Sequence, residues 1–205
     1  MDPGALQEIL PSLALGIGLA ACAGLRAWLP LLLTGLLARF GYLTLGPGFQ
    51  FLTSNRALIL FGVATAIELL GDKFPAVDHA LDAVGTVLRP TAGALLAASV
   101  FWPEMNDPLT AIALGVVIGA PSALVPHAAK SALRTLSTAF TGGLATPLIS
   151  LLEDVIALGM FVLAVLLPLV MAALVALAAF LVLRWWKSRA RTQAPPPASL
   201  PTAMA

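Results

Sequence analysis

The charged residues between positions 68 and 82 have the types and spacing of a site that binds ions or moves protons. Glu68 and Asp72 lie one helical turn apart, as do Asp78 and Asp82, and a glycine and a proline interrupt the helix between the two pairs. A broken helix exposes backbone carbonyls, which together with carboxylates suit a proton relay or a hard cation such as Na⁺, Mg²⁺ or Ca²⁺. A purely structural interpretation also fits. In it, Lys73 neutralises Asp72, and Asp78 and Asp82 form the water-exposed face of a helix at the membrane interface.

A second candidate is Arg26, which lies in an apolar stretch between Gly24 and Pro30. An arginine in such a stretch needs a substrate anion or an internal carboxylate as its partner, and Asp72 and Glu153 are the first carboxylates to consider. The alternative is an arginine that snorkels to the membrane interface with its charge in water.

A third set of polar residues follows in the second half of the chain. Lys130 and Arg134 are four residues apart on a predicted amphipathic helix, which leads into a glycine pair and then to Glu153 and Asp154. Amides exposed by the glycines suit an anion at a helix start, whereas a cytoplasmic amphipathic helix followed by a turn explains the same pattern without a ligand. The complete set of pathway or binding candidates is Arg26, Glu68, Asp72, Lys73, Asp78, Asp82, Lys130, Arg134, Glu153 and Asp154.

Several kinds of chemistry have no support in the sequence. His79 and His127 are isolated histidines without metal-ligand spacing, and the His-Glu-x-x-His and Gly-x-x-x-x-Gly-Lys motifs are absent. We therefore expect no catalytic residue, no metal and no cofactor, and we expect that the protein is not an enzyme. An enzyme that modifies lipids within the membrane is the remaining catalytic alternative.

The composition determines where these residues must work. Of the 205 residues, 60% are hydrophobic and only 10% are charged, and the mean hydropathy is +0.97. A typical soluble chain is about 25% charged, so this chain has too few charges to cover a surface in water. The sequence predicts an integral membrane protein whose charges mark the places where function is to be sought.

The apolar stretches predict an all-α, polytopic membrane protein with broken or re-entrant helices. Some are long enough to cross a bilayer, some are amphipathic and some are too short to cross. The stretches long enough to cross are 5–24, 109–125 and 155–183, and 57–70 is a further apolar stretch. The amphipathic stretches are 76–88 and 127–140, and the short ones are 90–102 and 142–152. The same order occurs in residues 57–102 and 109–152, which predicts an inverted repeat.

Small residues recur every four positions in the first stretch, at Gly16, Ala20 and Gly24. Such a face allows another helix to approach closely, so we expect these three residues to pack against a helix of the same chain or of a partner.

The C-terminal end of the chain is basic. Residues 155–205 contain no acid and four basic residues, Arg184, Lys187, Arg189 and Arg191, which adjoin a tryptophan pair. This pattern is typical of a cytoplasmic anchor against anionic lipid headgroups, and nucleic acid is not an expected partner. We expect a transmembrane domain over residues 1–186 and a disordered cytoplasmic tail over residues 187–205.

Three segments together resemble a family of bacterial integral membrane proteins that carries only a domain-of-unknown-function label and has relatives in plastids. They are GLRAWLPLL at 24–32, ELLGDKFP at 68–75 and LRTLSTAFTGGLATP at 133–147. The resemblance covers about residues 10–160. It implies a compact helical membrane protein and supplies no activity.

These observations predict a small transporter or channel-like permease of the bacterial inner membrane for an ion or small solute. The alternative is a scaffold or accessory subunit of a membrane complex that transports nothing. The expected partners are the lipid bilayer, an unidentified ion or small solute, and further copies of the chain in a homo-oligomer.

Overall fold

The computed structural model describes residues 3–105 and 107–192, and all regular structure within these ranges is helical. The elements are α1 (Pro3–Leu25), α2 (Trp28–Arg39), the 3₁₀ helix η1 (Pro47–Thr53), α3 (Asn55–Gly71), α4 (Pro75–Met105), α5 (Pro108–Leu114), the π-helical η2 (Gly115–Gly119), α6 (Ala120–Thr141) and α7 (Thr146–Thr192). The all-α fold predicted from the sequence is confirmed.

The chain forms two compact units, Met1–Leu169 and Val170–Ala205. The first unit contains every element from α1 to the first part of α7. The second contains the rest of α7, which extends to Thr192. Residues 193–205, most of the predicted tail, lie outside the described residues, so that prediction stays a prediction.

Three helical segments are long and apolar enough to cross a membrane: Ala80–Met105, Pro108–Thr141 and Thr146–Pro168. A fourth candidate is the pair of η1 and α3, which is bent by 62°. Large apolar side chains are exposed along these helices, as expected where hydrocarbon is the solvent. The chain is therefore a multi-pass membrane protein with at least one broken helix.

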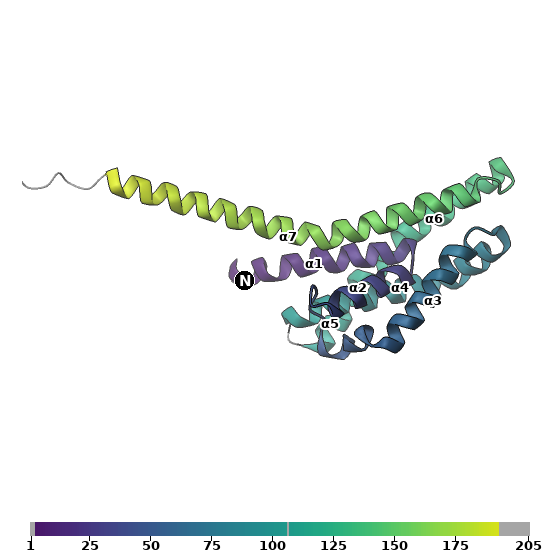
Figure 1. Ribbon diagram of the computed structural model, residues 1–205, viewed down its shortest axis with the longest axis horizontal. Helices are drawn as coiled ribbons and strands as arrows, with labels where there is room; N and C mark the ends of the chain where they lie inside the picture. The colour runs from purple at the N-terminus through teal and green to yellow at the C-terminus, as the bar shows by residue number, and fades with distance from the viewer. Residues whose placement is uncertain (1–2, 106, 193–205) are drawn as a thin grey trace, which may run out of the picture. The chain divides into compact units, whose positions relative to one another are not determined.

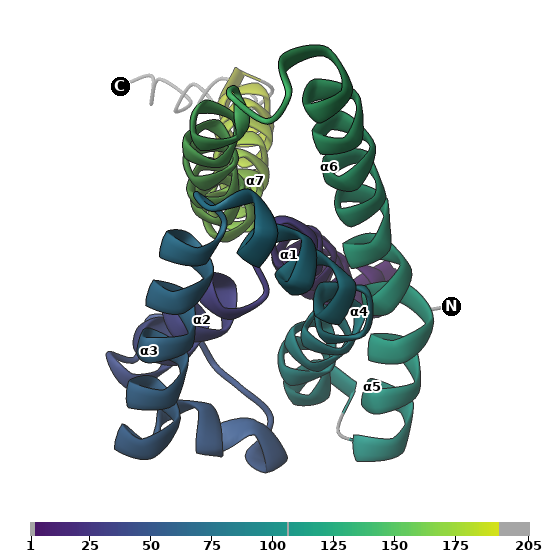
Figure 2. The same ribbon diagram turned by 90° about the vertical axis from the view of Figure 1, so that its right-hand side faces the viewer.

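The helices of the first unit pack around α1 and α4, which are in direct contact. Figure 2 shows α2 and α3 on one side of α1 and α4, with α5 and α6 on the other. Figure 1 shows the α3–α4 and α6–α7 connections at the same end of the unit. Contacts from Arg26 to Asp72 and Ser150 bring the α1–α2 connection to that end as well. Three helix connections thus meet around one volume.

Small residues set the distances between α1, α4 and α6. A side chain on Gly24 would collide with the carbonyl of Ala123 in α6, and one on Gly16 would collide with the ring of Phe101 in α4. Ala20 is fully buried between them. The face formed by Gly16, Ala20 and Gly24 is therefore used inside the chain.

The structure corrects two interpretations of the short apolar stretches. Residues 90–102 are not a separate re-entrant piece, because they continue the helix of 76–88 within α4, and Pro90 is accommodated in its interior. Residues 142–152 are likewise divided between a turn at 142–145 and the beginning of α7. A helix break therefore precedes the amphipathic stretch 76–88, whereas a break follows the amphipathic stretch 127–140. The inverted repeat stays a prediction.

Candidate functional site

Eleven charged side chains from α3, α4, α6, α7 and the connections between helices lie in mutual contact where the three connections meet. We call this group the charge cluster. Its members are the cations Arg26, Lys73, Arg89, Lys130 and Arg134 and the carboxylates Glu68, Asp72, Asp78, Asp82, Glu153 and Asp154.

Asp72 is at the centre of the charge cluster. It is fully buried in the α3–α4 connection, and its Oδ2 pairs with Arg26, with Lys130 Nζ at 3.1 Å and with Arg134 Nη2 at 3.3 Å. Burial alone would raise the pKa of Asp72, but the positive charges of Lys130, Arg26 and Arg134 outweigh it and hold the pKa below its usual range. One carboxylate thereby joins the α1–α2 connection to α6.

Arg134 joins α6 to α4 and α7. Its Nε and Nη2 donate to the two carboxylate oxygens of Glu153 at 3.0 and 2.5 Å, which is a bidentate pair, and its Nη1 pairs with Asp78. Lys130, one turn earlier on the same face, lies 3.3 Å from Glu153 Oε2. The basic residues of α6 therefore point into the bundle.

Glu68 forms hydrogen bonds with the backbone at the break between α1 and α2. Its carboxylate accepts hydrogen bonds from the backbone amides of Ala27 (3.1 Å) and Trp28 (3.3 Å), which lack partners within α2 because the helix begins there. Arg89 Nη2 lies 3.9 Å from the same carboxylate. Negative charge at a helix N-terminus is favourable, so Glu68 stabilises the broken backbone beside Arg26.

The first turns of α7 make polar contacts with the bundle. Arg26 Nη2 lies 2.5 Å from Asp154 Oδ1 and 3.2 Å from Ser150 Oγ, and it also donates to the carbonyl of Ser150 at 3.3 Å. Arg26 is entirely buried. The interpretation that it snorkels to the interface is therefore wrong, because its charge is matched by carboxylates inside the protein.

Arg89 and His127 extend the charge cluster toward the surface. Arg89 Nη1 donates to Asp82 Oδ1 at 3.0 Å and to His127 Nδ1. Because arginine has no acceptor, Nδ1 must accept, and the proton of the neutral imidazole is on Nε2, which lies 3.4 Å from the exposed Thr86 Oγ1.

Three members of the charge cluster are partly exposed and form its two edges. Lys73 and Asp154, whose charged atoms are 3.8 Å apart, have 40% and 20% of their side-chain surface exposed. Asp82, with 17% exposed, forms the other edge, 3.8 Å from Lys130. A continuous series of contacts runs from Lys73 and Asp154 through Arg26, Asp72 and Lys130 to Asp82.

The arrangement favours exchange of ion-pair partners over metal binding. Every carboxylate of the charge cluster faces at least one cation, and among the residues that the structure describes no three His, Cys, Asp or Glu side chains are grouped to hold a metal ion. The hard-cation interpretation of residues 68–82 thus finds no ligand set. The three arginines of the charge cluster cannot act as a simple proton wire, because arginine keeps its proton.

All ten candidates named from the sequence lie in the charge cluster. Lys73 contacts Asp154 and not Asp72, so the pairing of adjacent residues proposed in the structural interpretation is wrong. The sequence interpretation missed Arg89, although it lies two helical turns after Asp82 on the same face and is the one basic residue of α4. It also set aside His127 because only metal binding was considered.

The comparisons with known proteins give a family and no activity. Residues 13–188 match the family model described as "Domain of unknown function (DUF4126)". No curated protein and no solved structure matches the chain. Since the match spans most of the sequence, the chain belongs to this family.

Proposed function

We propose that this member of the DUF4126 family is a small permease that moves an ion or a small solute across the bacterial inner membrane. The observation that carries the proposal is the charge cluster itself: buried charges contributed by α3, α4, α6, α7 and the connections between helices, linked from one partly exposed edge to another. Burying a charge in a membrane protein is costly, and such residues usually line a path or drive a conformational change.

In this proposal the charge cluster works by exchanging partners. Asp72 and Glu153 each share several cations, so loss of one pair leaves another at similar distance. Protonation or solute binding at Asp82 or Asp154 would release Lys130 or Arg26 to other carboxylates. Because Arg26 and Arg134 hold the first part of α7, such an exchange loosens α7 from α1 and α6.

A flux screen in proteoliposomes tests the proposal. Purified protein is reconstituted and assayed for H⁺, Na⁺, K⁺, Mg²⁺, chloride, phosphate and small organic solutes against protein-free vesicles. We then compare Asp82→Asn, Asp154→Asn and Lys73→Gln, which alter the edges without removing a fully buried charge. Expected is flux that these variants reduce at least tenfold while thermal stability is kept.

Two exposed acids outside the charge cluster supply matched controls. Glu104→Gln and Asp107→Asn remove a carboxylate charge as Asp82→Asn and Asp154→Asn do, and asparagine retains the helix-capping ability of Asp107. Absence of flux for every solute, or flux that the edge variants leave at the level of the controls, contradicts the proposal.

The second candidate is a scaffold or accessory subunit that transports nothing. It is favoured by the ion pairs that each buried cation of the charge cluster makes with a carboxylate, which a purely structural network also requires. Its partner-binding surface cannot be the face of Gly16, Ala20 and Gly24, because that face is filled by α4 and α6. Affinity purification that yields one stoichiometric partner and no flux supports this candidate.

We also propose a cytoplasmic C-terminus and a homo-oligomer. Arg184 and the basic residues that follow it support the orientation, since positive charge is retained on the cytoplasmic side. The broad exposed apolar surface of the helices supports association of copies within the bilayer. Accessibility of a C-terminal tag in inside-out vesicles and cross-linking in native membranes test the two points.

A further inference from the structure

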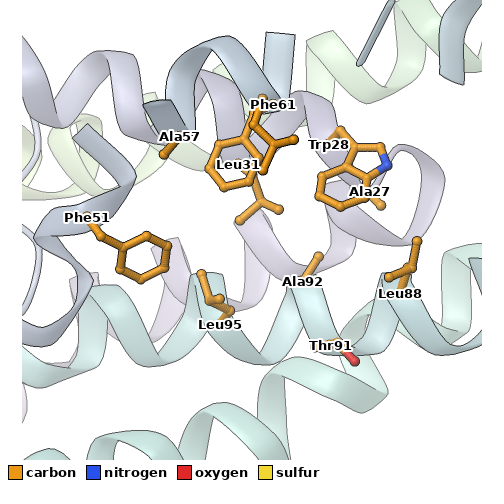
Figure 3. A pocket seen from close by; sticks show the side chains of 11 residues that line it. Ala27, Trp28, Leu31, Phe51, Ala57, Phe61, Leu88, Thr91, Ala92 and Leu95 are labelled. Carbon is orange, nitrogen blue, oxygen red and sulfur yellow. The ribbon is translucent and has the colours of Figure 1, made fainter. Parts of the chain in front are cut away.

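An apolar cavity lies between α2, η1, α3 and α4, and no member of the charge cluster lines it. Its volume is about 300 Å³, and Figure 3 shows the side chains that surround it. Phe51 and Leu95 lie at one end, Leu31 and Phe61 along the middle, and Trp28 at the other end.

The cavity offers nothing to a polar ligand. Thr91 has the one side-chain oxygen or hydroxyl among the lining residues, and it donates to the carbonyl of Val87 in its own helix at 2.7 Å. The hydroxyl points away from the cavity in Figure 3. The indole of Trp28 stacks on Phe61 with ring centroids 6.0 Å apart. A cavity with such walls stays dry and accepts apolar molecules.

The size and surroundings of the cavity match a hydrocarbon chain. It has about twice the volume that accommodates benzene, and it follows α4 from Leu88 to Leu95, about 10 Å of helix. Leu60 and Phe51, at its walls, have 60% and 50% of their surface exposed, so the cavity is open to the medium around the helices. In a membrane protein that medium is the acyl-chain region.

Positive charge lies at the end of the cavity near Phe51 and Ala57. Arg56 directly precedes Ala57 in the first turn of α3 and is exposed, and the exposed Arg39 at the end of α2 donates to Asn55, the residue before Arg56. Neither arginine has a carboxylate partner within the described residues. The exposed Phe40 and Tyr42 mark this end as the headgroup level, where aromatic side chains gather.

We propose that the cavity holds one acyl chain of an anionic phospholipid whose phosphate headgroup is bound by Arg39 and Arg56. The apolar walls accept the chain and the two arginines complement the headgroup charge. The site does not depend on the permease proposal, because none of its lining residues or arginines belongs to the charge cluster.

Lipid retention on the purified full-length protein tests this proposal. Protein reconstituted in equimolar phosphatidylglycerol and phosphatidylcholine with identical acyl chains is extracted in a non-ionic detergent, and bound lipid is identified by native mass spectrometry. Expected is one retained phosphatidylglycerol. Each surface arginine contributes about fivefold to binding of an anionic lipid, so Arg39→Gln with Arg56→Gln should lower the preference for phosphatidylglycerol about 30-fold.

Two variants that fill the cavity test the position of the chain. Ala92→Phe occupies it from α4, and Leu60→Trp narrows its mouth from a position too exposed to disturb the core. Both should reduce retained lipid at least tenfold. Leu163→Trp, at an equally exposed leucine of α7 (61% against 60%), is the matched control and should retain lipid as the wild type does.

The results separate the proposal from its alternatives. Equal retention of both lipids by the wild type overturns the headgroup assignment. Unchanged retention in Leu60→Trp overturns the assignment of the chain to the cavity, as does loss in Leu163→Trp to the same extent. Since the measurement is bound lipid and not transport, failure of the flux assay leaves this test unaffected.

Discussion

Replacement of Asp72 by asparagine is the most direct test of the charge cluster, because this carboxylate has three cationic partners and no exposure to solvent. The asparagine side chain has the same shape and keeps one acceptor oxygen, but it lacks the charge. Lys130 would lose its nearest carboxylate oxygen, at 3.1 Å, and Arg134 one at 3.3 Å. The structure predicts a large loss of stability without a change of fold.

The magnitude follows from opposing electrostatic effects. A pair of unit charges 3.1 Å apart gains about 5 kcal/mol at an effective dielectric constant of about 20. Three such pairs would exceed about 10 kcal/mol, but most of that is offset by the desolvation of the ions. Glu153 and Asp154 also remain as partners of the released cations. Loss of one partner from a buried pair costs about 3 to 5 kcal/mol, and we expect about 3 kcal/mol here.

Unfolding in mixed detergent micelles, followed by far-UV circular dichroism, measures this loss. For a domain of this size a loss of about 3 kcal/mol lowers Tm by about 10 °C. Asp107→Asn, the same change at an exposed acid, should leave Tm unchanged. Lys130→Met in the Asp72→Asn background removes the stranded charge, so the double variant should lose less than the sum of the two single variants.

Either of two results would show that Asp72 does not stabilise the charge cluster as its contacts indicate. One is an Asp72→Asn protein whose free energy of unfolding lies within about 0.5 kcal/mol of the wild type, which is the usual effect of a surface substitution. The other is a strictly additive double variant, which would mean that Asp72 and Lys130 do not interact despite their contact.

Three further predictions concern stability in detergent. Gly24→Ala should lower the free energy of unfolding by about 1 to 3 kcal/mol, because the added methyl group meets a backbone carbonyl of α6. Gly62→Ala, with open space around it, should raise the free energy of unfolding by up to about 1 kcal/mol. Equal Tm values for the two variants would contradict the close crossing of α1 and α6. The pKa of Asp72 is lower in the folded state than in the unfolded state, so the stability that its charge contributes is complete above the ordinary aspartate pKa and is lost as pH falls through the folded pKa. In that acid range Tm should therefore fall less steeply with decreasing pH for Asp72→Asn than for the wild type. Parallel plots of Tm against pH would contradict the lowered pKa of Asp72. Arg134→Met should lower the free energy of unfolding by about 3 to 5 kcal/mol, and Arg56→Met, at an exposed arginine, should lower it by less than about 1 kcal/mol. A comparable loss of Tm in both variants would show that burial of the charge cluster does not matter.

The sequence predicted which charged residues come together better than it predicted how they pair. Charge within an apolar stretch is costly wherever it occurs, so Arg26 and Asp72 could be selected without knowledge of the fold. Their contact could not be derived in the same way, because the two residues are 46 positions apart and meet only once α1, α3 and α4 are packed. The same applies to the pairing of Arg134 with Glu153 across the α6–α7 turn.

The lengths of the helices were less predictable, because proline was given too much weight. Pro90 suggested a boundary between an amphipathic and an apolar piece, yet α4 continues through it. In a membrane the alternative to a hydrogen-bonded helix is an exposed backbone, which costs more than a distorted turn. Proline therefore kinks a membrane helix where it would end a soluble one.

The positions of the helix breaks explain why the charges gather as they do. Breaks at 26–27, 72–74 and 142–145 all lie at one end of the first unit, and each leaves backbone groups without helical partners. Glu68 satisfies the amides at the first break, and Asp72 lies within the second. The charge cluster is thus a consequence of how three connections converge, and a repeat in the sequence is not needed to account for it. A permease mechanism would need these same contacts to have a second arrangement, so the decisive comparison is between variants of the exposed edges, which should alter flux, and Asp72→Asn, which should alter stability.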